Sequence, residues 1–315
     1  MAHLYDQIGV TRVINASGSM TYLGGSLIAA EVLEKMNEAA GAFVVMEELM
    51  DWAGAEIARL TGTEAGMVTS GSAGGILLAC AACLSGADPR LMRQLPLPQS
   101  SRNEFVMQRQ HRIGFDHAVG VAGGQIVEVG DAEKTRLGQI EAALSPNTAA
   151  ILHVVLDPQP TVPLEEVASL ARGRGVPLIV DAAAEVPPAE NLRRFIAQGA
   201  DLVAISGGKA IGGPQASGIL CGRWELIAAA ALQHQDLDVM PELWDPPASL
   251  IDKEKLPGAP QHGIGRPCKV GKEEIAGLLT ALKLFVEEEP QQRHGRWLQM
   301  MEALVAGCGD FAHAE

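Results

Sequence analysis

Aromatic residues are scarce in this sequence, which has 2 tyrosines, 6 phenylalanines and 4 tryptophans among 315 residues. The core must therefore consist mainly of Ala, Val, Leu and Ile, within a hydrophobic content of 47% that is ordinary for a globular protein. Basic residues are also few: 24 Lys and Arg stand against 38 Asp and Glu, a formal net charge of -14. Such an acidic surface repels phosphate groups, which argues against nucleic acids and anionic membranes as partners.

Long apolar runs and a regular cysteine pattern are missing as well. No segment approaches the ~20 apolar residues that span a bilayer, and Met1–Gln7 lacks the basic region and apolar stretch of a signal peptide. Five cysteines at irregular spacing indicate a reducing compartment, so we expect a cytoplasmic protein. Cys80 and Cys83 form a C-x-x-C inside an apolar helical run, where we expect small buried thiols and no metal.

Glycine, by contrast, is abundant, with 35 residues that mostly follow short apolar runs. These runs alternate with segments of helical periodicity, which predicts an α/β fold with a mostly parallel sheet of about seven strands and helices on both faces. The strands are expected at Gly66–Thr69, Glu104–Gln108, Gln125–Val129, Ala149–Val155, Val176–Asp181, Asp201–Ser206 and Ser217–Cys221.

Helices are expected between these strands and at both ends of the chain. They are predicted at Ser26–Ala40, Met46–Leu60, Ala73–Leu84, Asp116–Val121, Leu137–Leu144, Leu164–Arg172, Ala189–Gln198 and Lys272–Glu288, with one more after the last strand. Residues 233–265 are rich in Pro, Asp, Trp and His, which indicates an irregular connection or flap. We therefore predict an N-terminal segment at 1–40, a large domain at 41–265, and a bridging helix with a short or truncated α/β small domain at 266–315.

The most informative stretch is Asp201-Leu-Val-Ala-Ile-Ser-Gly-Gly-Lys-Ala-Ile-Gly-Gly-Pro-Gln-Ala-Ser-Gly218, in which a short strand enters a glycine-rich turn that presents Lys209. Upstream, another apolar strand ends on the carboxylate of Asp181. A pyridoxal phosphate enzyme needs an amine for its Schiff base and a carboxylate that keeps the pyridine nitrogen protonated. Lys209 and Asp181 are candidates for these roles, with a surface lysine and a helix-capping or solvated acid as the alternatives.

An anion-binding loop would complete the set, and Thr69-Ser-Gly-Ser-Ala-Gly-Gly75 lies between a strand and an apolar helix. Free N–H groups and the helix dipole form an anion site there without a basic side chain. Ser70 and Ser72 can add hydroxyl donors, and Ser206, three residues before Lys209, is a further candidate phosphate contact. A tight turn alone and a nucleotide site are the alternatives, although the loop matches neither the G-x-G-x-x-G nor the G-x-x-x-x-G-K-[ST] pattern.

Motifs along nearly the whole chain carry a family resemblance. Besides the anion loop they are Arg12-Val-Ile-Asn-Ala-Ser-Gly18, Gln110-His-Arg-Ile113, Ala200-Asp-Leu-Val203 with Ser206-Gly-Gly-Lys-Ala-Ile-Gly-Gly-Pro-Gln215, and Arg266-Pro-Cys-Lys-Val-Gly-Lys272. The Ser-Gly-x-Lys-x-x-Gly-Gly-Pro-Gln block is specific, and the others are supportive. On these residues the chain resembles fold-type I pyridoxal phosphate enzymes of the selenocysteine synthase group, and within it the proteins grouped with D-glucosaminate-6-phosphate ammonia-lyase.

The resemblance implies a fold-type I large domain and active sites completed at the interface of a homodimer or a higher homo-oligomer. It implies that Lys209 is the Schiff-base lysine and that Asp181 is the partner of the pyridinium nitrogen. It also implies that the cofactor phosphate is held by Ser70, Gly71, Ser72 and Ala73.

Three further residues are candidates beside the cofactor. His111 falls where this fold tends to place a residue near the ring, so it could stack there as an aromatic or move protons as a base; a hydrogen-bonded loop histidine is the alternative. Arg112 and Arg266 are candidates for binding a substrate carboxylate or phosphate, since a guanidinium grips either group bidentately. For both arginines the alternative is an ordinary surface position.

Departures from the resemblance limit what carries over. The selenocysteine synthases have a tRNA-binding region before the first shared motif, which begins here at Arg12. They have an Asn-Leu-Gly-Arg run where this chain has Tyr22-Leu-Gly-Gly25. These differences and the acidic charge argue against selenium transfer. Relatives also continue into a full small domain, so we expect that this domain is truncated or reduced here.

We therefore predict a pyridoxal phosphate-dependent lyase whose substrate is a small molecule, an amino acid. The predicted reaction is elimination from a hydroxy-amino acid, which gives a 2-keto acid and ammonia, with Lys209 as the amine that takes the α-proton. The same residues could serve a selenium transferase-like enzyme, a racemase, an aldolase, a transaminase or a decarboxylase. A non-catalytic, cofactor-binding homologue is a further alternative.

Overall fold

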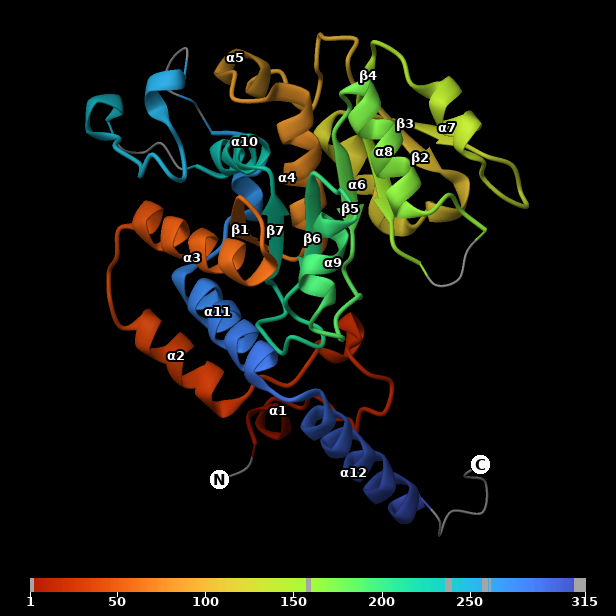
Figure 1. Cartoon of the computed structure of the whole chain (residues 1–315). Helices are drawn as coiled ribbons and strands as arrows, with labels where there is room; N and C mark the ends of the chain where they lie inside the picture. Colours follow the sequence, from red (N-terminus) through yellow and green to blue (C-terminus); the bar gives the residue numbers. More distant parts are fainter. Residues whose placement is uncertain (1–2, 157–159, 236–239, 257–259, 261, 309–315) are drawn as a thin grey trace.

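A seven-stranded sheet forms the centre of the computed structural model, which describes residues 3–156, 160–235, 240–256, 260 and 262–308. The strand order is β1-β7-β6-β5-β4-β2-β3 (Figure 1). β7 runs antiparallel to β1 and β6, whereas the pairs from β6 to β3 are parallel. The strands are β1 Ala65–Thr69, β2 Glu104–Gln108, β3 Gln125–Val129, β4 Thr148–Val154, β5 Leu178–Asp181, β6 Leu202–Ser206 and β7 Gly218–Gly222. The predicted α/β fold with a mostly parallel sheet is thus confirmed.

Twelve helices and six short 3-10 turns surround this sheet in the described residues. The helices are α1 Leu4–Gln7, α2 Ala30–Ala40, α3 Met46–Thr61, α4 Ser72–Ser85, α5 Pro89–Met92, α6 His117–Ala122, α7 Leu137–Ala143, α8 Leu164–Arg174, α9 Asn191–Ala197, α10 Trp224–His234, α11 Lys272–Glu287 and α12 Pro290–Cys308. The 3-10 turns are η1 Thr21–Leu23, η2 Arg109–His111, η3 Gly114–Asp116, η4 Pro241–Leu243, η5 Lys253–Lys255 and η6 Arg266–Cys268.

The helices cover both faces of the sheet, which explains the continuous apolar runs of its strands. α4, α6 and α10 share one hydrophobic core with the sheet, while α3, α7, α8, α9 and α11 share the core on the opposite face. Every residue of β4, β5, β6 and β7 is buried. α4 is apolar on all sides because it lies between the sheet and neighbouring helices, as the contacts with α10 and α6 show.

Several predicted elements differ in their bounds. β2 and β3 begin and end at the predicted residues, but α2 begins at Ala30 instead of Ser26. The hydroxyl of Ser26 contacts the carbonyl oxygen of Gly208 at 3.3 Å, so this stretch lies against the turn around Lys209. The conformation before α2 therefore follows from a contact between residues far apart in the sequence.

The C-terminal region begins with η6 and continues with α11, which packs against α2 and α3. α12 projects from the body of the molecule in Figure 1. The described part of residues 266–315 contains helices and turns and no strand. The division into segments 1–40, 41–265 and 266–315 stays a prediction.

The described residues also bear on membranes, metals and thiols. None of their helices is long and apolar enough to cross a membrane. They contain no group of three or more His, Cys, Asp or Glu side chains placed to hold a metal ion.

Cys80, Cys83 and Cys221 are buried free thiols, and burial raises the pKa of Cys83 and Cys221 to about 12. Such thiols stay protonated and unreactive at neutral pH.

Candidate active site

One edge of the sheet gathers the residues that the motifs singled out. Thr69 of β1 pairs with Gly218 of β7, and Gly218 pairs with Ser206 of β6. The next parallel strand, β5, ends on Asp181. Because the carboxyl ends of parallel strands meet at one edge, the loop after β1, the end of β5 and the turn that carries Lys209 lie together.

The loop after β1 leads directly into α4 and has the form of an anion site. Gly71 precedes the helix with φ +96°, a conformation that favours glycine. The hydroxyl of Thr69 donates to the carbonyl oxygen of Gly71 at 2.9 Å, and the N–H of Gly75 donates to the same oxygen at 3.0 Å. The N–H groups of the first helical turn have no acceptors within a helix, so those of Ser72 and Ala73 are suited to bind a phosphate.

Close backbone packing holds this loop in place. A Cβ added to Gly218 would lie 2.6 Å from the carbonyl carbon of Gly71 and 2.9 Å from the nitrogen of Ser72. A Cβ added to Gly74 would lie 2.7 Å from the hydroxyl oxygen of Ser70. The glycines therefore allow the loop to lie against β7 and its own helix, which fixes the direction of the N–H groups.

Asp181 is a buried carboxylate at the end of β5, with 7% of its surface exposed. Its Oδ1 accepts a hydrogen bond from the N–H of Ala183 at 3.1 Å. Burial raises the pKa of Asp181, against the opposing effects of that hydrogen bond and of the positive charge of Lys209. A pyridinium N–H would give this carboxylate the charged partner that stabilises its ionised form.

Lys209 is held on a turn whose shape is set by backbone hydrogen bonds. The N–H of Gly207 donates to the carbonyl oxygen of Ser217, and the N–H of Gly213 donates to that of Gly207, both at 2.9 Å. Gly212, with φ +77°, closes the turn by donating to the carbonyl oxygen of Lys209 at 2.9 Å. The lysine itself is half-buried, and its charge acts on Asp181. The structure thus brings together the two residues on which the sequence interpretation depends.

The N-terminal segment lies against this turn. The side-chain amide of Gln215 donates to the hydroxyl of Thr21 at 3.3 Å. Gly25 has φ +81°, and a Cβ there would lie 1.7 Å from Oε1 of Gln215 and 3.2 Å from the carbonyl oxygen of Gly208. By the resemblance described above, Gly25 stands where the selenocysteine synthases are expected to carry an arginine. That departure from their motif therefore falls beside Lys209.

His111 is the last residue of η2, the turn that follows β2, and 1% of its surface is exposed. Burial lowers its pKa to about 4. Nδ1 accepts a hydrogen bond from the backbone N–H of Val154 at 3.3 Å, and Val154 is the residue of β4 that pairs with Asp181. The structure thus places His111 close to the predicted cofactor partner.

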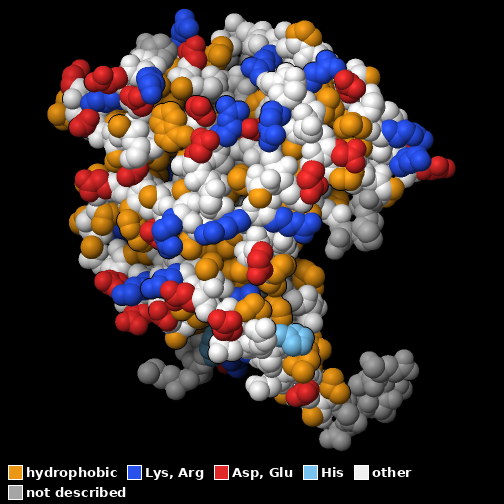
Figure 2. All heavy atoms as spheres, viewed as in Figure 1, with side chains coloured by type: hydrophobic (Ala, Val, Ile, Leu, Met, Phe, Trp, Pro, Cys, Tyr) orange, Lys and Arg blue, Asp and Glu red, His pale blue; other side chains and the backbone are white. Residues whose placement is uncertain are grey.

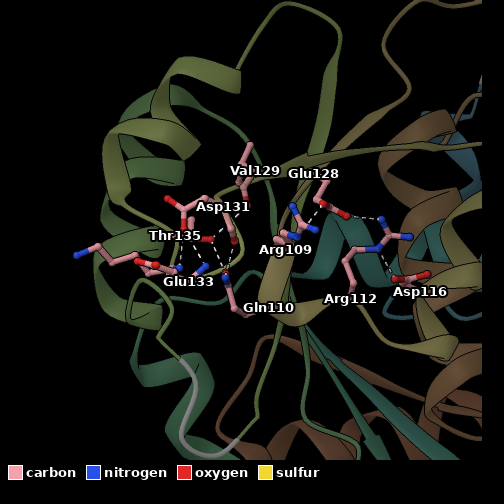
Figure 3. A network of polar contacts seen from close by, with 10 residues as sticks. Arg109, Gln110, Arg112, Asp116, Glu128, Val129, Asp131, Glu133 and Thr135 are labelled. Atoms are coloured by element: carbon pink, nitrogen blue, oxygen red, sulfur yellow. Dashed lines mark hydrogen bonds and ion pairs between the residues drawn. The ribbon is translucent and has the colours of Figure 1, made fainter.

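Arg112 and Arg266 are the two arginines predicted to bind substrate. Arg112 pairs with Asp116 at 2.5 Å and with Glu128 at 2.9 Å, within a surface network that also contains Arg109 (Figure 3). These carboxylates occupy its guanidinium, so a substrate would have to replace them. Arg266 is the first residue of η6. Gly265, which precedes it, lies close to Leu78 of α4 and Gln233 of α10. The substrate roles of both arginines stay predictions.

A second histidine was missed in the sequence. His153 lies in the buried strand β4, and its ring contacts that of His111 at a centroid distance of 4.3 Å and an interplanar angle of 71°. The signal was a polar residue in the otherwise apolar run Ala149–Val155. A polar side chain in a fully buried strand is expected to have a hydrogen-bond partner or a functional role.

A comparison with models of protein families finds one that matches this chain. Residues 13–240 match the model of SelA, L-seryl-tRNA selenium transferase. The chain belongs to the L-seryl-tRNA selenium transferase family. This membership confirms the resemblance to the selenocysteine synthase group, and it includes the segment with the anion loop, Asp181 and Lys209.

Two relatives of the chain have different reactions in their names. The chain is 35% identical to a 5'-C-glycyluridine monooxygenase-decarboxylase from Streptomyces sp, over 96% of this chain and 70% of that protein. It is 34% identical to a D-glucosaminate-6-phosphate ammonia lyase from Salmonella typhimurium (strain 14028s / SGSC 2262), over 99% of this chain and 78% of that protein.

A solved structure of D-glucosaminate-6-phosphate ammonia-lyase matches 91% of this chain and 71% of that one, with a TM-score of 0.79 and 34% identity. A SepCysS–SepCysE complex matches at a TM-score of 0.55 and 15% identity, which bears on the fold alone. The relatives show that this chain is an enzyme of a pyridoxal phosphate-dependent family, and they support an ammonia-lyase function.

Proposed function

We propose that the protein binds pyridoxal phosphate at Lys209 and eliminates water from a hydroxy-amino acid, with release of a 2-keto acid and ammonia. The observation that carries this proposal is the placement of Asp181, Lys209 and the N-terminus of α4 at one edge of the sheet. The identity to an ammonia lyase over nearly the whole chain supports the reaction type.

The described residues fit this cofactor. The N–H groups at the start of α4, with the hydroxyls of Ser70, Ser72 and Ser206, would bind its phosphate. The carboxylate of Asp181, which lacks a charged hydrogen-bond partner in the described residues, would hold the ring nitrogen protonated. Pyridoxal phosphate supplies an electron sink for the charge that forms at the substrate α-carbon.

The protein side chains would divide the remaining steps. Nζ of Lys209 would bind the cofactor covalently, give way to the substrate amine and then take the α-proton. The β-hydroxyl would leave as water. Hydrolysis of the released product would then give the 2-keto acid and ammonia. The face of His111 would pack beside the ring and keep it in place.

The substrate is proposed to be a hydroxy-amino acid with a phosphate group, because the ammonia-lyase relative is named for D-glucosaminate 6-phosphate. The test is to supply the protein with pyridoxal phosphate and D-glucosaminate 6-phosphate, D-glucosaminate, serine or threonine, and to measure ammonia and 2-keto acid. Equal amounts of both products are expected from at least one of these substrates. Formation of pyridoxamine phosphate during turnover would contradict elimination and point to transamination.

Decarboxylation is the second candidate, because the Streptomyces relative is 35% identical and has decarboxylase in its name. The same incubations separate the two reactions when carbon dioxide is measured alongside ammonia. Carbon dioxide without 2-keto acid would favour decarboxylation and overturn the elimination proposal.

We also propose that the enzyme is at least a homodimer in the cytoplasm. The resemblance to fold-type I enzymes supports a shared site, in which each centre is completed by a neighbouring chain. The buried free thiols are consistent with a reducing compartment. The net charge of -14 argues against a nucleic-acid partner.

A further inference from the structure

Two buried histidines contact each other near the end of β4, the strand that pairs with β5 and Asp181. His111 ends η2, which follows β2, and His153 lies in the neighbouring strand β4. Their exposed fractions are 1% and 6%. The rings meet at 4.3 Å between centroids and 71° between planes, an edge-on arrangement that aromatic rings favour.

The hydrogen bond of His111 fixes where its proton sits. A backbone N–H acts as a donor, so Nδ1 of His111 must offer a lone pair to the N–H of Val154, 3.3 Å away. In a neutral imidazole the proton then lies on Nε2. Because Val154 pairs with Asp181 in the sheet, this fixed ring lies one strand from the carboxylate.

We propose that His153 is a positioning residue that holds His111 as a neutral ring protonated at Nε2. The adjacent residues His153 and Val154 fix His111 together, one by ring contact and the other by its N–H. His111 then presents a flat face and an N–H donor. Its lone pair is engaged by the backbone, so proton abstraction is left to Lys209. The role of this ring beside the cofactor rests on the proposed function, whereas its tautomer does not.

The surroundings of the pair support a neutral state. Burial lowers the pKa of His111 to about 4 and that of His153 to about 3, and the nearby His111 lowers the latter further. β4 pairs with β2 and β5. The charged or titratable groups near this end of those strands include Asp181 on β5, Lys209, whose charge acts on Asp181, and Arg109 just after β2, which pairs with Glu128 at 3.6 Å (Figure 3).

The test is a long-range proton–nitrogen NMR spectrum of the full chain with 15N-labelled histidine, recorded without cofactor. The variant His111→Gln assigns the His111 signals. The expected spectrum shows His111 protonated at Nε2 and unprotonated at Nδ1, with no titration between pH 8 and about 5, given its lowered pKa. An Nδ1-protonated form, or titration near the ordinary histidine value, would overturn the proposal.

Two substitutions at His153 test the positioning role. His153→Leu removes the ring that packs edge-on against His111, so the spectrum of His111 should change from a single Nε2-protonated form to a mixture of tautomers. His153→Phe keeps a ring edge and removes Nδ1, which has no hydrogen-bond partner in the described part of the chain. It should fold and preserve the Nε2-protonated form of His111. An unchanged His111 spectrum in His153→Leu would refute the positioning role.

His294→Gln, on the exposed surface of α12, is the matched control and should leave the His111 signals unchanged. Because the spectra are recorded without cofactor or substrate, they do not depend on turnover. A failure to bind pyridoxal phosphate would refute the proposed function and leave the tautomer standing. An Nδ1-protonated His111 in an active enzyme would refute only the positioning role.

Discussion

Asp181 is the residue whose environment links stability to function. Burial raises its pKa, so the folded, cofactor-free protein holds this proton more tightly than the unfolded chain does. The stabilisation is therefore fully present below the ordinary pKa of 3.8 and is lost as the pH rises through the raised value. Above this raised pKa the cofactor-free protein carries a buried charge that the cofactor would compensate.

The substitution Asp181→Asn is therefore expected to stabilise the cofactor-free protein at pH 7. Asn retains an oxygen that can accept the hydrogen bond from Ala183 and removes the buried charge. We expect a rise in Tm of about 2 °C or more, together with loss of turnover because the ring nitrogen loses its charged partner. Thermal unfolding followed by circular dichroism measures the first effect. The control is Glu133→Gln, which removes the same charge from an exposed side chain and should shift Tm little. A lower Tm for Asp181→Asn would contradict this account of the site.

The structure brings together two residues that a distinctive local pattern singled out in the sequence. Lys209 lies in a glycine-rich turn and Asp181 at a strand end, and both features are visible without a structure. The pairing of Arg112, the residue after η2, with Glu128 of β3 is a contact that local sequence does not reveal. The contact between His111 and His153 depends likewise on the pairing of β2 with β4.

At the scale of elements, the start of α4 depends on its contact with β7. Gly218 lies so close to Gly71 and Ser72 that a methyl group would have to move their backbone. Those N–H groups are the proposed phosphate donors. The geometry of the anion site is thus coupled to a strand almost 150 residues away in the sequence.

We expect Gly218→Ala to lower the affinity for pyridoxal phosphate at least about tenfold and to destabilise the fold by about 1–3 kcal/mol, because the added methyl group overpacks this contact. Titration of cofactor absorbance and urea unfolding measure the two effects. Gly138→Ala in α7 is the matched control, since open space surrounds its Cβ position. Alanine has the higher helix propensity, so this control should gain up to about 1 kcal/mol. Equal cofactor affinity in both variants would argue against the proposed phosphate site.

The elements themselves were largely predictable from periodicity. Helix and strand alternation predicted the sheet because its strands are buried on both faces and read as apolar runs. The predicted start of α2 at Ser26 was wrong: the helix begins at Ala30, and the hydroxyl of Ser26 instead donates to the carbonyl oxygen of Gly208 in the turn around Lys209. Strand order and the antiparallel β7 follow from tertiary pairing, which periodicity does not determine.

For the whole molecule, the N-terminal part leaves large apolar side chains exposed. Leu27 is 97% exposed and Phe43 is fully exposed. Figure 2 shows hydrophobic side chains in the lower part of the molecule, over the N-terminal segment and α12. Apolar clusters of this kind mark protein interfaces, which is consistent with the proposed homodimer.

We therefore expect a mass of at least twice the 33.1 kDa of the chain by light scattering after size-exclusion chromatography. The double substitution Leu27→Lys and Phe43→Lys should shift the mass toward the monomer, because it places charge in the interface. Leu97→Lys is the control, as Leu97 is 82% exposed outside this segment. A monomeric wild-type protein would contradict the proposed assembly.

The most direct test of the central claim is borohydride reduction of the protein with pyridoxal phosphate, followed by mass mapping of the modified peptide. The account predicts visible absorbance that disappears on reduction and a pyridoxyl group on Lys209. Lys209→Ala should lose the adduct, the absorbance and about 100-fold or more of turnover. A folded wild-type protein without an adduct, or with the adduct on another lysine, would contradict the claim.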